Sequence, residues 1–162
     1  MSPRGAMIIV ATVVSGVCQP SSTRAAQPTH TQVVNGICDP SSHTAEGPLG
    51  ADLTKRQSRF YCNSAVITFF GDHKGHVIIQ FAQKEAHHGP ILAFSGKVED
   101  DGIIMSVNRV YLTAGTPVTV SDRMCKFFFK NRQMSGIFCG MKVDETGRRT
   151  TAIVAFNAAP GQ

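Results

Sequence analysis

The stretch CKFFFKNRQMSGIFCGMKV, from Cys125 to Val143, holds two apolar runs on either side of a short polar segment. Runs rich in aromatic and branched residues, separated by a few polar ones, are typical of the two strands of a β-hairpin. If the hairpin is centred on Arg132, Cys125 lies directly opposite Cys139, at a separation that suits a disulfide. This register requires a loop with an odd number of residues.

The same register predicts which side chains share a face of the hairpin. It places Phe127 opposite Ile137 and Phe129 opposite Ser135. Because side chains alternate along a strand, Phe128 must point to the face opposite Phe127 and Phe129. One aromatic side chain of this strand is therefore expected on the outer face of the sheet.

This outer aromatic residue is the candidate binding site. An exposed Phe128 flanked by Lys126 and Lys130 suits a protein, glycan or lipid partner. The alternative is that a second layer, such as residues 36–60, covers this face.

Further strand-like runs surround the hairpin on both sides. They are bounded by turn-forming segments, of which Asp100-Asp101-Gly102 is a strong hairpin signal. A change of alternation at Asn108-Arg109 predicts a β-bulge. The runs cover residues 66–70, 77–82, 92–98, 103–112, 118–120 and 150–156. Short connections favour antiparallel pairing. We therefore expect an all-β fold, an antiparallel meander of about seven or eight strands with two disulfides, forming a barrel or a sandwich, the barrel being favoured.

The N-terminus is expected to be an export signal. Residues 1–25 begin with a basic segment, continue with an apolar run and end in small residues, in the order of a secretory signal peptide. A lipoprotein signal at Cys18 is disfavoured, because Val17 stands where a small residue is usual. A buried strand is the other alternative. The predicted division is 1–25 signal peptide, 26–58 irregular segment with a helical turn near 52–57, and 59–160 antiparallel β domain.

The cysteine count fits a periplasmic or secreted protein. Of the five cysteines, Cys18 lies in the predicted signal, and the remaining even number points to two disulfides. With Cys125 paired to Cys139, elimination pairs Cys38 with Cys62. A zinc site is disfavoured because the sequence has no closely spaced cysteine pair.

Two histidines are the candidate metal ligands. His73 and His76 flank one turn, and imidazoles bind Zn²⁺ or Cu²⁺. The alternative is that both are solvated loop residues. No nucleophile motif of the G-x-S-x-G type occurs, and no cofactor motif is recognised. The sequence therefore predicts neither an enzyme nor a cofactor.

Charge and hydropathy narrow the choice of partners. The formal net charge is +5, but the basic residues are scattered, which does not favour nucleic acid. No apolar run reaches the roughly 20 residues of a membrane-spanning helix. We expect an exported domain that binds an apolar ligand inside the barrel or an envelope protein. The alternative is a periplasmic metal-binding protein.

Overall fold

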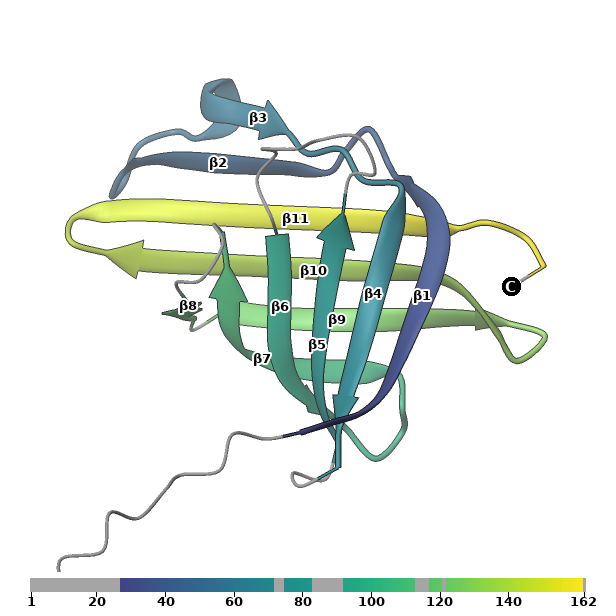
Figure 1. Cartoon of the computed structure of the whole chain (residues 1–162). Coiled ribbons are helices and arrows are strands. Elements are labelled where there is room, and N and C mark those ends of the chain that lie inside the picture. The colour runs from purple at the N-terminus through teal and green to yellow at the C-terminus, as the bar shows by residue number, and fades with distance from the viewer. Residues whose placement is uncertain (1–26, 72–74, 83–91, 113–116, 121, 162) are drawn as a thin grey trace, which may run out of the picture.

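The computed structural model describes residues 27–71, 75–82, 92–112, 117–120 and 122–161. Within these ranges the chain forms eleven strands and one 3₁₀ turn (Figure 1). In chain order these are β1 (Pro28–Cys38), β2 (His43–Pro48), η1 (Thr54–Arg56), β3 (Gln57–Arg59), β4 (Ser64–Phe70), β5 (His76–Ala82), β6 (Leu92–Val98), β7 (Ile104–Tyr111), β8 (Pro117–Thr119), β9 (Asp122–Lys130), β10 (Gln133–Glu145) and β11 (Arg148–Ala158).

Eight of the strands form a closed antiparallel barrel. They follow the order β1-β4-β5-β6-β7-β9-β10-β11, and β1 returns to β11 through the pairs Gly36↔Ala158 and Cys38↔Phe156. Figure 1 shows β4, β5 and β6 crossing β9, β10 and β11 at a steep angle, while β1 and β7 curve from one layer to the other. The predicted antiparallel all-β fold is confirmed, and of the two predicted architectures it is the barrel.

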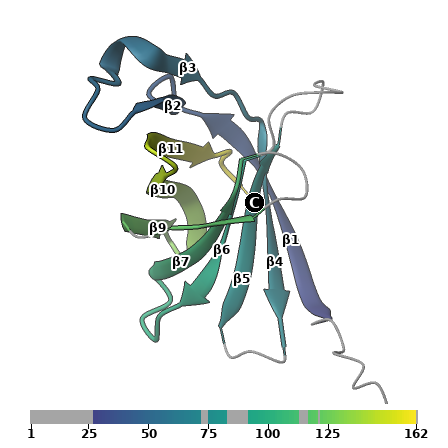
Figure 2. The ribbon, with the colours of Figure 1, turned by 90° about the vertical axis from the view of Figure 1, so that its left-hand side faces the viewer.

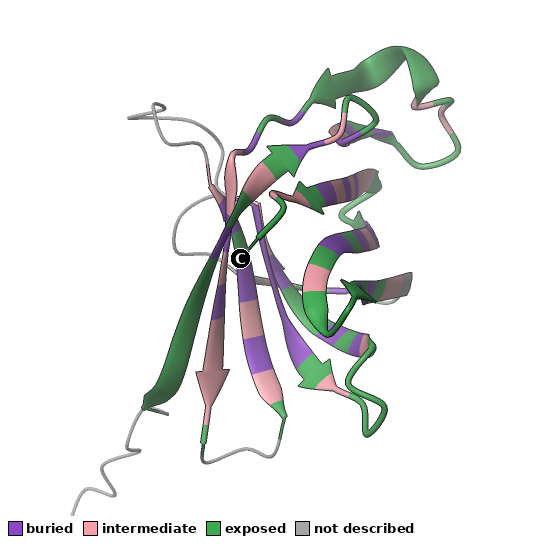
Figure 3. Ribbon diagram, turned by 90° about the vertical axis from the view of Figure 1, so that its right-hand side faces the viewer, coloured by how far each residue is buried: buried purple, intermediate pink, exposed green. Residues whose placement is uncertain are grey.

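Alternate side chains of the barrel strands point into the interior and are buried there. Figure 3 shows the resulting bands of buried and exposed residues. The ring of Phe81 lies with its centroid 6.0 Å from that of Phe94 and 6.0 Å from that of Phe156. These rings belong to one continuous cluster of buried residues contributed by every barrel strand. Inward-facing side chains thus pack on one another across the barrel.

The N-terminal segment differs from the prediction of an irregular stretch over 26–58. It forms β1 and β2, and β1 is a wall of the barrel. The hydrophobic pattern of β1 is weak because most of its side chains are exposed, Val34 and Cys38 being the buried ones. At the closure with β11, a Cβ on Gly36 would lie 2.2 Å from the Asn157 carbonyl oxygen. The close approach of the two strands therefore requires glycine here.

A two-stranded flap, residues 43–59, extends the sheet beyond the barrel. β2 pairs with the first half of β11, and β3 pairs with β2 (Figure 2). The turn before the flap is fixed by Ser42, whose Oγ donates to the Ala155 carbonyl oxygen and accepts from the Ala155 N–H. The predicted helical turn near 52–57 appears as η1, and the Asp52 carboxylate accepts hydrogen bonds from Thr54 N and Oγ1.

The hairpin of β9 and β10 reaches the predicted cysteine register by a different route. Its turn has two residues, Asn131 and Arg132, both with positive φ, and not an odd number. A β-bulge at Ser135 supplies the extra residue that brings Cys125 opposite Cys139. Phe129 consequently faces Met134, which corrects the predicted pairing with Ser135.

Two other register predictions are confirmed. Phe127 pairs with Ile137 across the same hairpin. Between β6 and β7, Ser95 pairs with Arg109 and Gly96 with Val107, which leaves Asn108 as the extra residue of a bulge. The change of alternation in the sequence therefore marks the position where the strand bulges.

Candidate functional site

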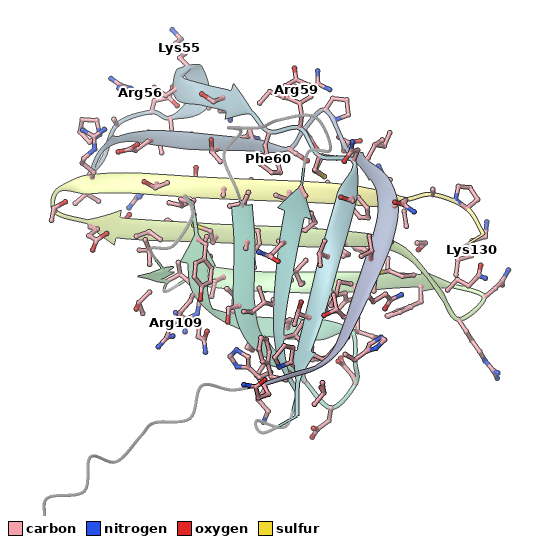
Figure 4. All side chains as sticks on the ribbon, in the orientation of Figure 1. Lys55, Arg56, Arg59, Phe60, Arg109 and Lys130 are labelled. Atoms are coloured by element: carbon pink, nitrogen blue, oxygen red, sulfur yellow. A yellow bond between two sulfur atoms is a disulfide. The ribbon has the colours of Figure 1, made fainter. Side chains whose placement is uncertain are left out.

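The outer face of β9 carries the predicted aromatic residue. Phe127 points inward and is 5% exposed, whereas Phe128 points outward and is 44% exposed. Lys126 shares the outer face with Phe128, because the two positions are two residues apart on one strand. Lys130 follows near the end of β9, where Figure 4 labels it. The described residues thus leave Phe128 uncovered by a second layer.

Cross-strand pairing gathers more apolar side chains around Phe128. Phe138 of β10 is paired with Lys126, and Met124 lies two residues before Lys126 on the same face. A second row runs from Phe128 through Gly136 and Asn157 to Ile37 of β1. Ile153 of β11 is paired with Gly140. We call this surface the aromatic wall, and define it as Ile37, Met124, Phe128, Phe138 and Ile153.

The two phenylalanine rings of the aromatic wall lie beside glycines. The Cδ2 atom of Phe128 is 4.0 Å from the position that a Cβ would take on Gly136. The Cε1 atom of Phe138 is 3.8 Å from the equivalent position on Gly140. Aromatic rings that cover glycines in a sheet bury exposed backbone and are held in place by it. Each ring therefore has a contact within the sheet itself.

Positive charge accompanies the aromatic wall. The Nζ atom of Lys126 lies 5.4 Å from the centroid of the Phe128 ring, within the range of a cation–π interaction. Lys126 and Lys130 have no ion-pair partner among the described residues. At the other end of β10, near its turn to β11, Arg149 donates two hydrogen bonds to the carboxylate of Asp144 and neutralises its charge. The charge beside Phe128 is thus uncompensated by the described side chains.

Both predicted disulfides are present, and one of them lies on the inner face of the two strands that carry Phe128 and Phe138. Cys38 is bonded to Cys62, and Cys125 to Cys139, with the Cα atoms of the second pair 4.1 Å apart. Cys125 and Cys139 are fully buried. They cross-link the two strands that carry Phe128 and Phe138 on their outer faces, and so hold the register of these strands covalently.

The predicted metal ligands are only partly visible in the structure. His73 lies outside the described residues. His76, on β5, places Nε2 3.1 Å from the Ser95 Oγ, and its ring packs edge-on against Phe70. In the part of the chain that the structure describes, no three His, Cys, Asp or Glu side chains are grouped so that they could hold a metal ion. The metal site stays a prediction.

Sequence reasoning found Phe128 and Lys126 but missed the residues that enlarge the surface. Phe138 and Met124 were within reach, because the register that pairs Cys125 with Cys139 also places Phe138 beside Lys126. Ile37 could not be predicted, because it joins the surface only through the pairing of β1 with β11. That closure brings together strands at opposite ends of the chain.

No protein-family model, curated protein or solved structure matches the chain. Across the described ranges, no helix is long and apolar enough to cross a membrane. The function is therefore inferred from the geometry of the surface.

Proposed function

We propose that the chain is a small exported binding module that acts through the aromatic wall and has no catalytic role. The observation that carries the proposal is the exposure of Phe128 and Phe138, at 44% and 38%, on two strands joined by a buried disulfide. A grouped apolar surface on a small domain is typical of an interaction site. Lys126 and Lys130 favour a protein partner that presents apolar side chains next to a carboxylate.

The packing of the interior supports a surface site over an apolar ligand inside the barrel. Phe81 packs against both Phe94 and Phe156, and all three belong to one continuous buried cluster. A ligand-binding barrel needs space that side chains leave open. The continuous buried cluster of interior side chains favours binding at the outer face over binding inside the barrel.

The two disulfides support export, because disulfides persist in oxidising compartments such as the periplasm or the extracellular space. The order of residues 1–25, basic, then apolar, then small, is that of a secretory signal peptide and supports export as well. Sequencing the N-terminus of protein from the native compartment should find a start near Ala26, and full-length cytosolic protein would contradict export.

The chemistry of the described side chains supports binding over catalysis. Cys38, Cys62, Cys125 and Cys139 are all oxidised, so none of them offers a thiolate. The buried hydroxyl of Ser42 is engaged by both the N–H and the carbonyl oxygen of Ala155. It serves as a structural contact and is not placed as a nucleophile.

Site-specific photo-crosslinking in living cells tests the proposal. A photoreactive phenylalanine analogue at position 128 or 138 should yield one discrete adduct with a second protein. The matched control is the same analogue at Tyr61, which is 52% exposed, stacks under Arg59 and is not one of the aromatic-wall residues. The adduct should weaken when Lys126→Glu reverses the neighbouring charge. Equal adducts from positions 128 and 61, or none from 128 and 138, would refute the proposal.

A further inference from the structure

A concave surface lies beside the flap, at one end of the barrel. It is a depression of about 560 Å³. Its lining comes from the flap, from the start of β11 and from the end of β7, and consists of Thr44, Ala45, Glu46, Arg56, Ser58, Leu112, Arg148 and Thr150. The mouth of a barrel is a common place for a small-molecule site, and this volume lies within the usual range.

The pairing of β10, β11, β2 and β3 explains why hydroxyl side chains line the depression. Met141 and Ala152 are buried inward-facing neighbours on β10 and β11. The same row continues outward through Thr44 of β2 to Ser58 of β3. Where the sheet leaves the barrel, hydroxyl side chains therefore replace apolar ones on the inner face. Thr150, on the neighbouring row, contributes a third hydroxyl.

The charges of the depression leave one cation in excess. Arg148 donates from Nε to the Glu46 carboxylate at 2.7 Å, and the pair is mutually neutral. This bond uses one of the five guanidinium donors of Arg148, so the remaining donors stay available. The Arg56 guanidinium has no hydrogen bond or ion pair with the described residues.

The flap itself positions Arg56 (Figure 4). Its Cδ atom lies 3.1 Å from the position that a Cβ would take on Gly47, so its stem packs over this glycine. The nearby Asp52 carboxylate is occupied by Thr54, which fixes the start of η1. Arg56 is thus held by the flap and not by an acidic partner.

We propose that this depression binds a small monovalent carboxylate that carries hydroxyl groups, the chemistry of a sugar acid. A planar guanidinium binds a carboxylate through paired hydrogen bonds, which Arg56 offers. The hydroxyls of Thr44, Ser58 and Thr150 can each donate and accept, as recognition of a polyol requires. Glu46 disfavours a doubly charged phosphate, because only one positive charge is in excess. The hydroxyls of this site face the opposite side of the sheet from the aromatic wall.

Titration of the isotope-labelled, full mature protein with D-glucuronate, followed by amide NMR, tests this site. D-glucuronate should shift amides of β2, β3 and the start of β11 in a saturable way. D-glucose, which lacks the carboxylate, should bind about tenfold more weakly or not at all. Acetate, which lacks the hydroxyls, should also bind more weakly.

Two arginine variants of the flap make the test specific. Arg56→Gln should weaken D-glucuronate binding by about tenfold. Arg59→Gln is the matched control, since it removes the same charge from the same flap, but Arg59 stacks on Tyr61 and does not line the depression. Unshifted far-ultraviolet circular dichroism shows that both variants fold. Equal effects of the two variants, shifts spread over the whole surface, or no saturation by about 20 mM would overturn the proposal.

Discussion

Cys125 and Cys139 occupy directly opposite positions on β9 and β10 because Ser135 is bulged out of β10. With the two-residue turn alone and every residue paired, Cys125 would face Phe138, whose side chain points outward. The bulge therefore sets both the disulfide and the face on which Phe138 appears.

The bulge predicts different outcomes for two deletions of equal length. Deleting Ser135 removes the extra residue, so Cys125 should still pair with Cys139, and thiol titration should find neither free. Deleting Gly136 instead moves Ser135 into the glycine position, where a Cβ would lie 2.7 Å from the Phe156 carbonyl oxygen. Urea unfolding should show this variant to be less stable than the first by about 1–3 kcal/mol. The reverse order of stability would contradict the assigned bulge.

Neighbouring phenylalanines of β9 should differ sharply in their contribution to stability. Phe127→Ala empties a buried position and should reduce the free energy of unfolding by about 3–4 kcal/mol. Phe128→Ala removes a half-exposed ring and should cost less than about 1 kcal/mol. Chemical unfolding of both variants measures the difference. Similar losses at the two positions would mean that the outer face is covered and not available to a partner.

The pair of Asp144 and Arg149 should make part of the stability depend on pH. Hydrogen bonds from Arg149 hold the pKa of Asp144 below its ordinary value of 3.8. A carboxyl whose pKa is lower in the folded state stabilises the fold above the unfolded-state pKa, and this contribution is lost as the pH falls through the folded value. Carbon-detected NMR titration should find the depressed pKa of Asp144, and Arg149→Gln should raise it. An unchanged pKa in that variant would assign the shift to another cause.

The metal-binding alternative makes a separate prediction. If His73 and His76 form a site, calorimetry with Zn²⁺ or Cu²⁺ should show saturable binding that His76→Ala removes. Ser95→Ala is the control, because it removes the Ser95 hydroxyl from the His76 ring without removing the imidazole, and binding should persist. Equal binding by the wild type and His76→Ala would exclude His76 as a ligand.

Features that depend on interactions between residues close in the sequence could be predicted from the sequence. The hairpin around Arg132 and the bulge at Asn108 follow from alternation over about twenty positions or fewer. The cysteine pair was predicted correctly from the wrong turn, because the bulge at Ser135 and not an odd-length loop sets its register. The outward direction of Phe128 follows from the same alternation. These features needed no knowledge of distant strands.

The sequence could not reveal β1, the flap or the contribution of Ile37. β1 is mostly exposed, so burial leaves little hydrophobic pattern in it, and its pairing with β4 and β11 is decided by distant backbone. The depression next to Arg56 likewise depends on the flap pairing with β11. Non-local pairing of polar strands is the step that single-sequence patterns do not encode.

The closure of the barrel provides the last prediction. β1 meets β11 through a short ladder at Gly36, Ile37 and Cys38, and the Cys38–Cys62 disulfide is attached to its end. Replacing both Cys38 and Cys62 by serine should lower the free energy of unfolding by roughly 3.5 kcal/mol in the chain-entropy model. Because this ladder is short, we also expect its amides to lose protection from hydrogen exchange before those of β5 and β6.

The other disulfide supplies the matched control for this prediction. Replacing Cys125 and Cys139 by serine should cost roughly 3 kcal/mol, a similar amount. The strands that it joins are paired along most of their length, so the β1–β11 ladder should keep its protection relative to the rest of the barrel. Hydrogen exchange followed by mass spectrometry compares the two double variants. If Cys38→Ser with Cys62→Ser leaves the β1–β11 amides as protected as those of β5, the closure does not depend on the disulfide and the prediction is wrong.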